Sequence, residues 1–187
     1  YKELDIFMHS SGFYRNNNEE LCVQGILVSD LAKKYGTPLF VYDSGLMKER
    51  YNVFLDTVAC VGGNIHYAVK ANDALAIVSY FTKLGCGADI VSIGEFEKCV
   101  AAGMSPQKII FSGVGKENSE IEVALKNNIL QFNIESQEEL DDIYKIASKL
   151  KLTANICLRV NPNIAPNTHK KISTGEKETK FGIDFKN

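Results

Sequence analysis

"ADIVSIGEFEKCVAAGMSPQKIIFS", residues 88–112, contains one complete period of the pattern that decides the fold. Short β-rich runs at 88–92 and 108–112 enclose a helical segment that opens with Ser92 and Glu95. In such an S-x-x-E capping box, each side chain accepts a backbone N–H that the first helical turn leaves without a partner. The stretch therefore predicts a strand, a helix and a second strand, which together form the βαβ unit of a parallel sheet.

The same alternation recurs along most of the chain. Strands are predicted at 38–42, 64–69, 88–92, 108–112, 129–134 and 154–160. Further helix boundaries are indicated by Asn72 with Asp73, Ser119 with Glu122, Ser136 with Glu139, and Gly85. Apolar strands that alternate with amphipathic helices predict an α/β fold with a parallel sheet. A (β/α) barrel is the preferred architecture, and a doubly wound open sheet fits the same pattern.

Two segments depart from this repeat. "FYRNNNEELCVQG", residues 13–25, predicts a strand, a turn and a strand, followed by a short helix at 29–36, so residues 1–36 are expected to belong to another layer or domain. The segment 161–182 has little periodicity, and long irregular connections in compact domains are often active-site lids or disordered. It follows the carboxyl end of a predicted strand, which is where barrel enzymes build their active sites.

Composition excludes several classes of function. The chain has 187 residues, of which 45% are hydrophobic, and a net charge of −2, which gives no reason to expect nucleic acid or a membrane surface as partner. Its five cysteines and three histidines are scattered without metal-ligand spacing, as expected for reduced thiols in a cytosolic protein. No apolar run is long enough to cross a bilayer. The first residue is Tyr1 rather than Met, so the chain is expected to be a piece of a longer one.

Lys70 is the candidate catalytic residue. It lies in "NIHYAVKAN", residues 64–72, at the end of a predicted core strand where neighbouring groups are expected to exclude part of the water. Desolvation favours the neutral amine, which is the form that attacks a carbonyl group. A lysine that reaches the rim and keeps its charge in water explains this residue equally simply, and on position alone it is the more common case.

A family resemblance changes that balance. "HYAVKAN", "GTPLFVYD", "IIFSGVGK", "NIESQEEL" and "LRVNPNIAPNTHKKISTGEKETKFGID" together resemble the fold-type III pyridoxal-phosphate decarboxylases, which are related to alanine racemase. The last stretch is most similar to the diaminopimelate decarboxylase branch. The resemblance implies a partial (β/α)8, TIM-like, alanine-racemase-type barrel over residues 37–187, with residues 1–36 as the N-terminal segment of a second, β domain. It further implies a cytoplasmic homodimer.

The resemblance also assigns roles to individual residues. Lys70 matches the family lysine that holds pyridoxal 5'-phosphate covalently and later acts as an acid or base at the reacting carbon. Asp89 and Arg159 match positions close to that cofactor, although a solvated strand residue and a rim ion pair explain them too. Ser92 and Glu95 match the family's S-x-x-E, which a capping box explains equally well. The sequence departs from the family at Ile93, where glycine is common.

The segment 161–182 resembles the family's active-site loop, in which His169, Ser173 and Thr174 are the substrate-binding candidates. The lysines there would attract a substrate with two carboxylates, although a solvated polar loop explains them as well. The implied reaction converts meso-2,6-diaminopimelate to L-lysine and CO2. The chain covers about half of such an enzyme, so alone it is expected to be inactive. A related decarboxylase or racemase, and a catalytically silent homologue that binds partners, remain the alternatives.

Overall fold

The computed structural model describes residues 12–162 and 182–184. The chain divides into two compact units, Tyr1–Gly63 and Asn64–Asn187. No helix in the described part of the chain combines the length and the apolar character needed to cross a membrane. Each unit is built around its own sheet, and the second one contains Lys70, Asp89 and Arg159.

The first unit contains an antiparallel sheet in the order β1-β2-β3, followed by two helices. Its elements are β1 (Phe13–Arg15), β2 (Leu21–Val23), β3 (Ile26–Leu27), α2 (Val28–Tyr35) and α3 (Ser44–Ala59). The predicted strand, turn, strand and short helix are confirmed. Asp43 caps α3 by accepting the backbone N–H of Leu46 at 3.0 Å, and this bond lowers the pKa of the Asp43 carboxyl.

The strand predicted at 38–42 is wrong. These residues connect α2 to α3 without regular structure, and Phe40 is 86% exposed. Local β propensity makes a strand only when another strand supplies hydrogen bonds, and within the described residues no strand lies beside this segment.

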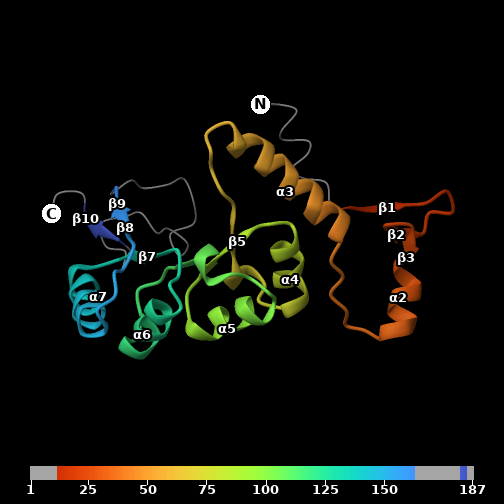
Figure 1. The fold of residues 1–187 in the computed structure, drawn as a ribbon. Coiled ribbons are helices and arrows are strands. Elements are labelled where there is room, and N and C mark those ends of the chain that lie inside the picture. The colour runs from red at the N-terminus through yellow and green to blue at the C-terminus, as the bar shows by residue number, and fades with distance from the viewer. Residues whose placement is uncertain (1–11, 163–181, 185–187) are drawn as a thin grey trace. The chain divides into compact units, whose positions relative to one another are not determined.

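The second unit is a five-stranded parallel sheet in the order β4-β5-β6-β7-β8 (Figure 1). Its strands are β4 (His66–Ala68), β5 (Gly87–Ile90), β6 (Ile109–Phe111), β7 (Gln131–Ile134) and β8 (Ile156–Leu158). The α-helices are α4 (Leu75–Lys83), α5 (Ile93–Ala101), α6 (Asn118–Lys126) and α7 (Gln137–Leu150), and the 3-10 turns are η1 (Val69–Ala71) and η2 (Pro106–Lys108). A short parallel pair, β9 (Val160–Asn161) and β10 (Ile183–Asp184), follows β8.

The strand order and the alternation with helices confirm the α/β class with a parallel sheet. Helices α4 to α7 lie side by side along one face of the sheet (Figure 1). Among the described residues the sheet does not close into a barrel. The five predicted strands after residue 63 are all present, each one to four residues shorter in total than predicted.

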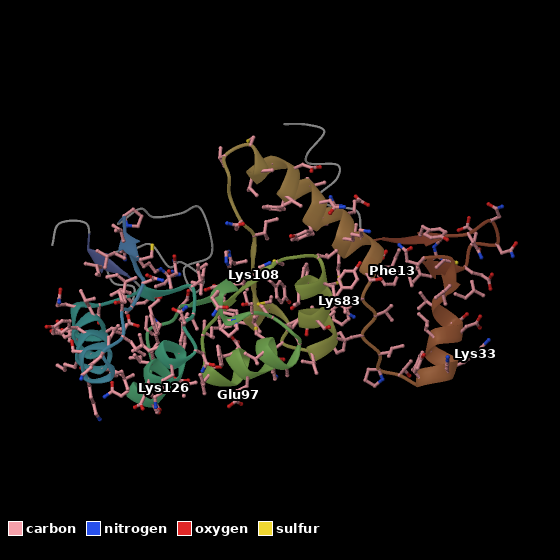
Figure 2. All side chains as sticks on the ribbon, in the orientation of Figure 1. Phe13, Lys33, Lys83, Glu97, Lys108 and Lys126 are labelled. Carbon is pink, nitrogen blue, oxygen red and sulfur yellow. The ribbon has the colours of Figure 1, made fainter. Side chains whose placement is uncertain are left out.

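The two faces of this sheet differ in polarity. Register places Ala88 beside Ile109 and Phe111 beside Phe132, so apolar side chains line the face under the helices. These residues are fully buried with Ile90 and Ile134 at the centre of the hydrophobic core. The opposite face presents mainly polar side chains, namely His66, Asp89, Ser112, Gln131, Asn133 and Glu135. In Figure 2 the labelled Glu97 and Lys126 lie on α5 and α6, at the outer side of the helix layer.

Helix capping follows the sequence at two of three predicted boxes. Ser92 and Ser136 cap α5 and α7 by accepting backbone N–H groups at 3.3 and 3.2 Å. The prediction for Ser119 is wrong, because α6 begins two residues earlier with Glu117 as its cap. Gly85 follows α4 with φ of 93°, which confirms its predicted role, since glycine adopts this conformation without strain.

Candidate active site

Lys70 lies in η1, immediately after β4 at the carboxyl edge of the sheet. The turn that carries it is fixed from both sides: Val69 is fully buried, and the Tyr67 hydroxyl donates a hydrogen bond to the Asn72 carbonyl at 3.0 Å. Tyr67 in turn stacks on Phe81 of α4, with ring centroids 4.4 Å apart. The Lys70 side chain itself is exposed, so the partial exclusion of water expected from the sequence is not found in this chain.

Asp89 lies in β5 on the polar face of the sheet, where register pairs it with Ala68 of β4 and Ile110 of β6. Its carboxylate accepts a hydrogen bond from the Ser112 hydroxyl, which itself accepts one from the Asn133 amide at 2.9 Å. Gln131 donates to the Asn133 side-chain oxygen at 2.9 Å. Four polar side chains from three adjacent strands thus form one chain of hydrogen bonds that ends on the Asp89 carboxylate.

His66 lies on the same face, at the first position of β4. Burial lowers the pKa of its imidazole, although the nearby Asp89 carboxylate opposes the shift. Its ring fits against the sheet because position 87 is glycine, where an added Cβ atom would lie 2.4 Å from His66 Cδ2. Burial therefore disfavours the charged form of the imidazole, and Gly87 leaves the space that the ring occupies.

Arg159 lies between β8 and β9, at the same carboxyl edge as Lys70. Its guanidinium donates a hydrogen bond to Glu135 Oε1 at 3.0 Å, and its side chain is 40% exposed whereas that of Glu135 is 2% exposed. The Glu135 carboxylate also accepts the backbone N–H groups of Gly113 at 3.3 Å and Gly182 at 3.1 Å.

A second ion pair, which is buried, lies beside the first. Lys116 has a fully buried side chain, which donates to the carbonyls of Gly113 and Asn133, both at 2.8 Å, and to the Glu139 carboxylate. Glu139 Oε2 accepts the backbone N–H of Glu135 at 2.6 Å. The two pairs therefore form one network that ties the loop before α6 to the ends of β7 and β8.

The structure places Lys70, Asp89 and Arg159 along the carboxyl edge of one sheet. Lys70 follows β4, the first strand in the sheet order, and Arg159 follows β8, the last. His169, Ser173 and Thr174 lie outside the described residues. Within the described residues, no three His, Cys, Asp or Glu side chains gather as metal ligands.

Sequence reasoning missed four polar residues of this edge. They are Ser112, Lys116, Asn133 and Glu135. Their signal was present in "FSGVGK" and "FNIES", where polar side chains fall at or just beyond the carboxyl ends of predicted strands. Ser92 and Glu95, by contrast, act as a helix cap: Glu95 accepts the backbone N–H of Val91 at 2.8 Å.

Several curated diaminopimelate decarboxylases are similar to this chain. The diaminopimelate decarboxylase of Zymomonas mobilis is 44% identical over 169 residues, and that of Aquifex aeolicus is 40% identical over 187 residues. These matches cover 89% and 98% of this chain but only 40% and 43% of the relatives, so the chain spans about two fifths of their length.

Solved structures show the same fold. The diaminopimelate decarboxylase of M. jannaschii, in complex with L-lysine, superposes with a TM-score of 0.85 at 38% identity, covering 94% of this chain and 42% of that one. The Helicobacter pylori enzyme, also complexed with L-lysine, gives 0.81 at 45% identity over 83% and 40%. Residues 45–187 match the family model described as "Pyridoxal-dependent decarboxylase, pyridoxal binding domain". The chain therefore belongs to the family of pyridoxal-dependent decarboxylases.

Proposed function

We propose that the protein to which this chain belongs is a diaminopimelate decarboxylase, which converts meso-2,6-diaminopimelate to L-lysine and CO2. The observation that carries the proposal is the position of Lys70, directly after β4 on the edge where Asp89 and Arg159 also lie. The family match over residues 45–187 and the identity to diaminopimelate decarboxylases support it.

The proposed architecture is the first part of a (β/α)8 barrel of the alanine-racemase type. Helices cover one face of the parallel sheet, and the polar face would become the barrel interior. Closing the sheet would bring the end of β4 toward the end of β8, and so Lys70 toward Arg159. We assign residues 37–187 to this barrel and residues 1–36 to a second, β domain.

The polar edge offers three groups that suit pyridoxal 5'-phosphate. Lys70 offers an accessible amine for the aldehyde, while Asp89 and Arg159 offer a carboxylate and a guanidinium for the polar atoms of the ring. The hydrogen bonds to Asp89 from Ser112, and from Arg159 to Glu135, hold both charged groups in place before any ligand arrives. We propose Lys70, Asp89 and Arg159 as the cofactor-binding residues.

The cofactor, when bound, supplies an electron sink that accepts the electron pair left behind as CO2 departs. The residues of this chain would bind and orient the cofactor and the substrate. Lys70 Nζ would hold the cofactor and later return a proton to the α carbon of the substrate. Arg159, fixed by Glu135, would hold the cofactor so that the breaking bond is aligned with the ring system. His169, Ser173 and Thr174 are proposed to contact the substrate.

The proposal also includes a homodimeric, cytoplasmic enzyme. It rests on the family match over residues 45–187. Light scattering of the full-length protein tests the dimer.

Product analysis tests the activity. Full-length protein, pyridoxal 5'-phosphate and meso-2,6-diaminopimelate should yield L-lysine and CO2 in equal amounts, and the Lys70→Ala variant should yield neither. Release of an amine other than L-lysine would identify a related decarboxylase. A change in the chirality of the amino acid without release of CO2 would identify a racemase. A full-length protein that leaves meso-2,6-diaminopimelate unchanged and does not bind the cofactor would be a silent homologue.

A further inference from the structure

Glu135 connects three separate segments at the proposed cofactor edge. Its carboxylate, 2% exposed, accepts from Arg159 at the β8–β9 junction, from Gly113 after β6 and from Gly182 before β10. Oε1 takes the first two donors and Oε2 takes the third. Because each bond comes from a different part of the chain, the geometry of this edge depends on one carboxylate.

The position of the Glu135 carboxylate is itself set by its neighbours. Its backbone N–H donates to Glu139 Oε2 at 2.6 Å, and Glu139 pairs with the buried Lys116. Lys116 also bonds the carbonyl of Gly113, so the same loop is held to the network through both its N–H and its C=O. The buried Lys116–Glu139 pair and the hydrogen bonds to the Glu135 carboxylate leave Glu135 little freedom to move.

Arg159 is the member of this network that reaches the open edge. Its backbone is fixed on both sides, because its N–H donates to Ile134 and its carbonyl accepts from Ile183 at 2.8 Å. Its side chain, 40% exposed, has Glu135 as a buried anionic partner that directs the guanidinium. An arginine presents donors in a rigid planar fork, so fixing one edge of the fork fixes the direction of the others.

We propose that Glu135 is a positioning residue that acts through Arg159 and sets the affinity of the site for pyridoxal 5'-phosphate. This inference rests on the proposed function. Gly182 lies so close to Arg159 that only glycine fits there. Its φ is 78°, and an added Cβ atom would lie 2.9 Å from the Arg159 carbonyl oxygen. The start of β10 is thereby held against the residue that Glu135 orients.

The test is a double-mutant cycle on the full-length apoenzyme, read by absorbance titration with pyridoxal 5'-phosphate. Glu135→Gln keeps the shape but puts an amide N–H₂ opposite a backbone or guanidinium donor, so we expect the dissociation constant of the cofactor to rise at least about tenfold. In the Arg159→Gln background the same change should add less than about twofold, since coupled residues are not additive.

Two further variants separate positioning from general damage. Glu138→Gln removes an equal charge from an exposed residue of α7 and should leave the dissociation constant unchanged. Glu135→Asp keeps the charge and should give an affinity between those of the wild type and Glu135→Gln. If Glu135→Gln does not fold to the native circular dichroism spectrum, the cycle is run with Glu135→Asp and Arg159→Lys. The loss of affinity from the change at residue 135 should again be smaller in the Arg159 variant than in the wild type.

The outcomes are distinct. A wild-type protein that does not bind the cofactor would overturn the proposed function. A wild type that binds, with equal losses from Glu135→Gln in both backgrounds or with no loss at all, would overturn the positioning role of Glu135 alone.

Discussion

Replacement of Lys116 by methionine should strongly destabilise the second unit. The lysine side chain is fully buried, and its ammonium bonds Glu139 and two backbone carbonyls at 2.8 Å. Methionine fills similar volume but leaves the Glu139 charge and both carbonyls without this donor. Removing one partner of a buried ion pair costs about 3–5 kcal/mol of unfolding free energy. Urea denaturation followed by circular dichroism measures the loss directly.

Lys126→Met is the matched control. Lys126 also pairs with a glutamate, Glu122, but its side chain is 54% exposed and that of Glu122 42% exposed, so water replaces the lost contact. The denaturation midpoint of this variant should stay close to that of the wild type. If Lys116→Met and Lys126→Met have equal urea midpoints, and the unfolding free energy falls with urea at equal slopes, burial of the Lys116–Glu139 pair does not make it important for stability.

Three further predictions concern titration, thiol reactivity and activity. Burial lowers the pKa of His66 below its usual value of 6.5, so the unfolded chain binds a proton more readily than the folded chain does. The stability that this group contributes should be present above about pH 6.5 and should be lost as the pH falls below it. Denaturation midpoints measured from about pH 7.5 to 5 should show a smaller loss in the His66→Gln variant than in the wild type. Burial raises the pKa of the Cys86 and Cys99 thiols to about 11. At pH 8, iodoacetamide should therefore label the exposed Cys60 and Cys157 of the folded chain and leave Cys86 and Cys99 unlabelled, which mass spectrometry would show. Equal labelling of all four thiols would contradict the burial of Cys86 and Cys99. The 187-residue chain alone should not produce L-lysine in the product assay, and sustained turnover would show that the remaining length of its relatives is dispensable.

The parallel sheet could be predicted from sequence because its signals are local. A buried strand such as 109–111 is apolar throughout, and a capping serine such as Ser92 marks where the next helix begins. The same local signals fail when two of them overlap. "KENSEIE" offers both Glu117 and Ser119 as a cap, and the structure uses Glu117, whose side chain and that of Glu120 satisfy each other's backbone N–H.

Two segments of the first unit were harder to predict than its short strands, which pair with close neighbours in sequence. Helix α3 gave no clear amphipathic pattern: Tyr51 is buried, while Phe54 is 57% and Val53 39% exposed. Residues 38–42 have the composition of a strand but no strand beside them among the described residues. Pattern reasoning detects an apolar stripe and cannot supply a missing hydrogen-bonding partner.

Sequence could propose the residues of the candidate site but not the contacts between them. Family resemblance singled out Lys70, Asp89 and Arg159, and the strand pattern placed Lys70 at the end of a strand. The bond between Glu135 and Arg159 joins residues 24 positions apart, so it arises only when β7 and β8 pair in register. Sequence left the exposure of Lys70 open, since it depends on how much chain surrounds the strand end.

Borohydride trapping tests the assignment of Lys70 most directly. Full-length protein is incubated with pyridoxal 5'-phosphate, reduced, digested and mapped by mass spectrometry, with Lys70→Ala as the control. We expect one pyridoxyl group per chain, on the peptide that contains Lys70, and none in the variant. A label on another lysine, or no label at cofactor saturation, would contradict the role of Lys70.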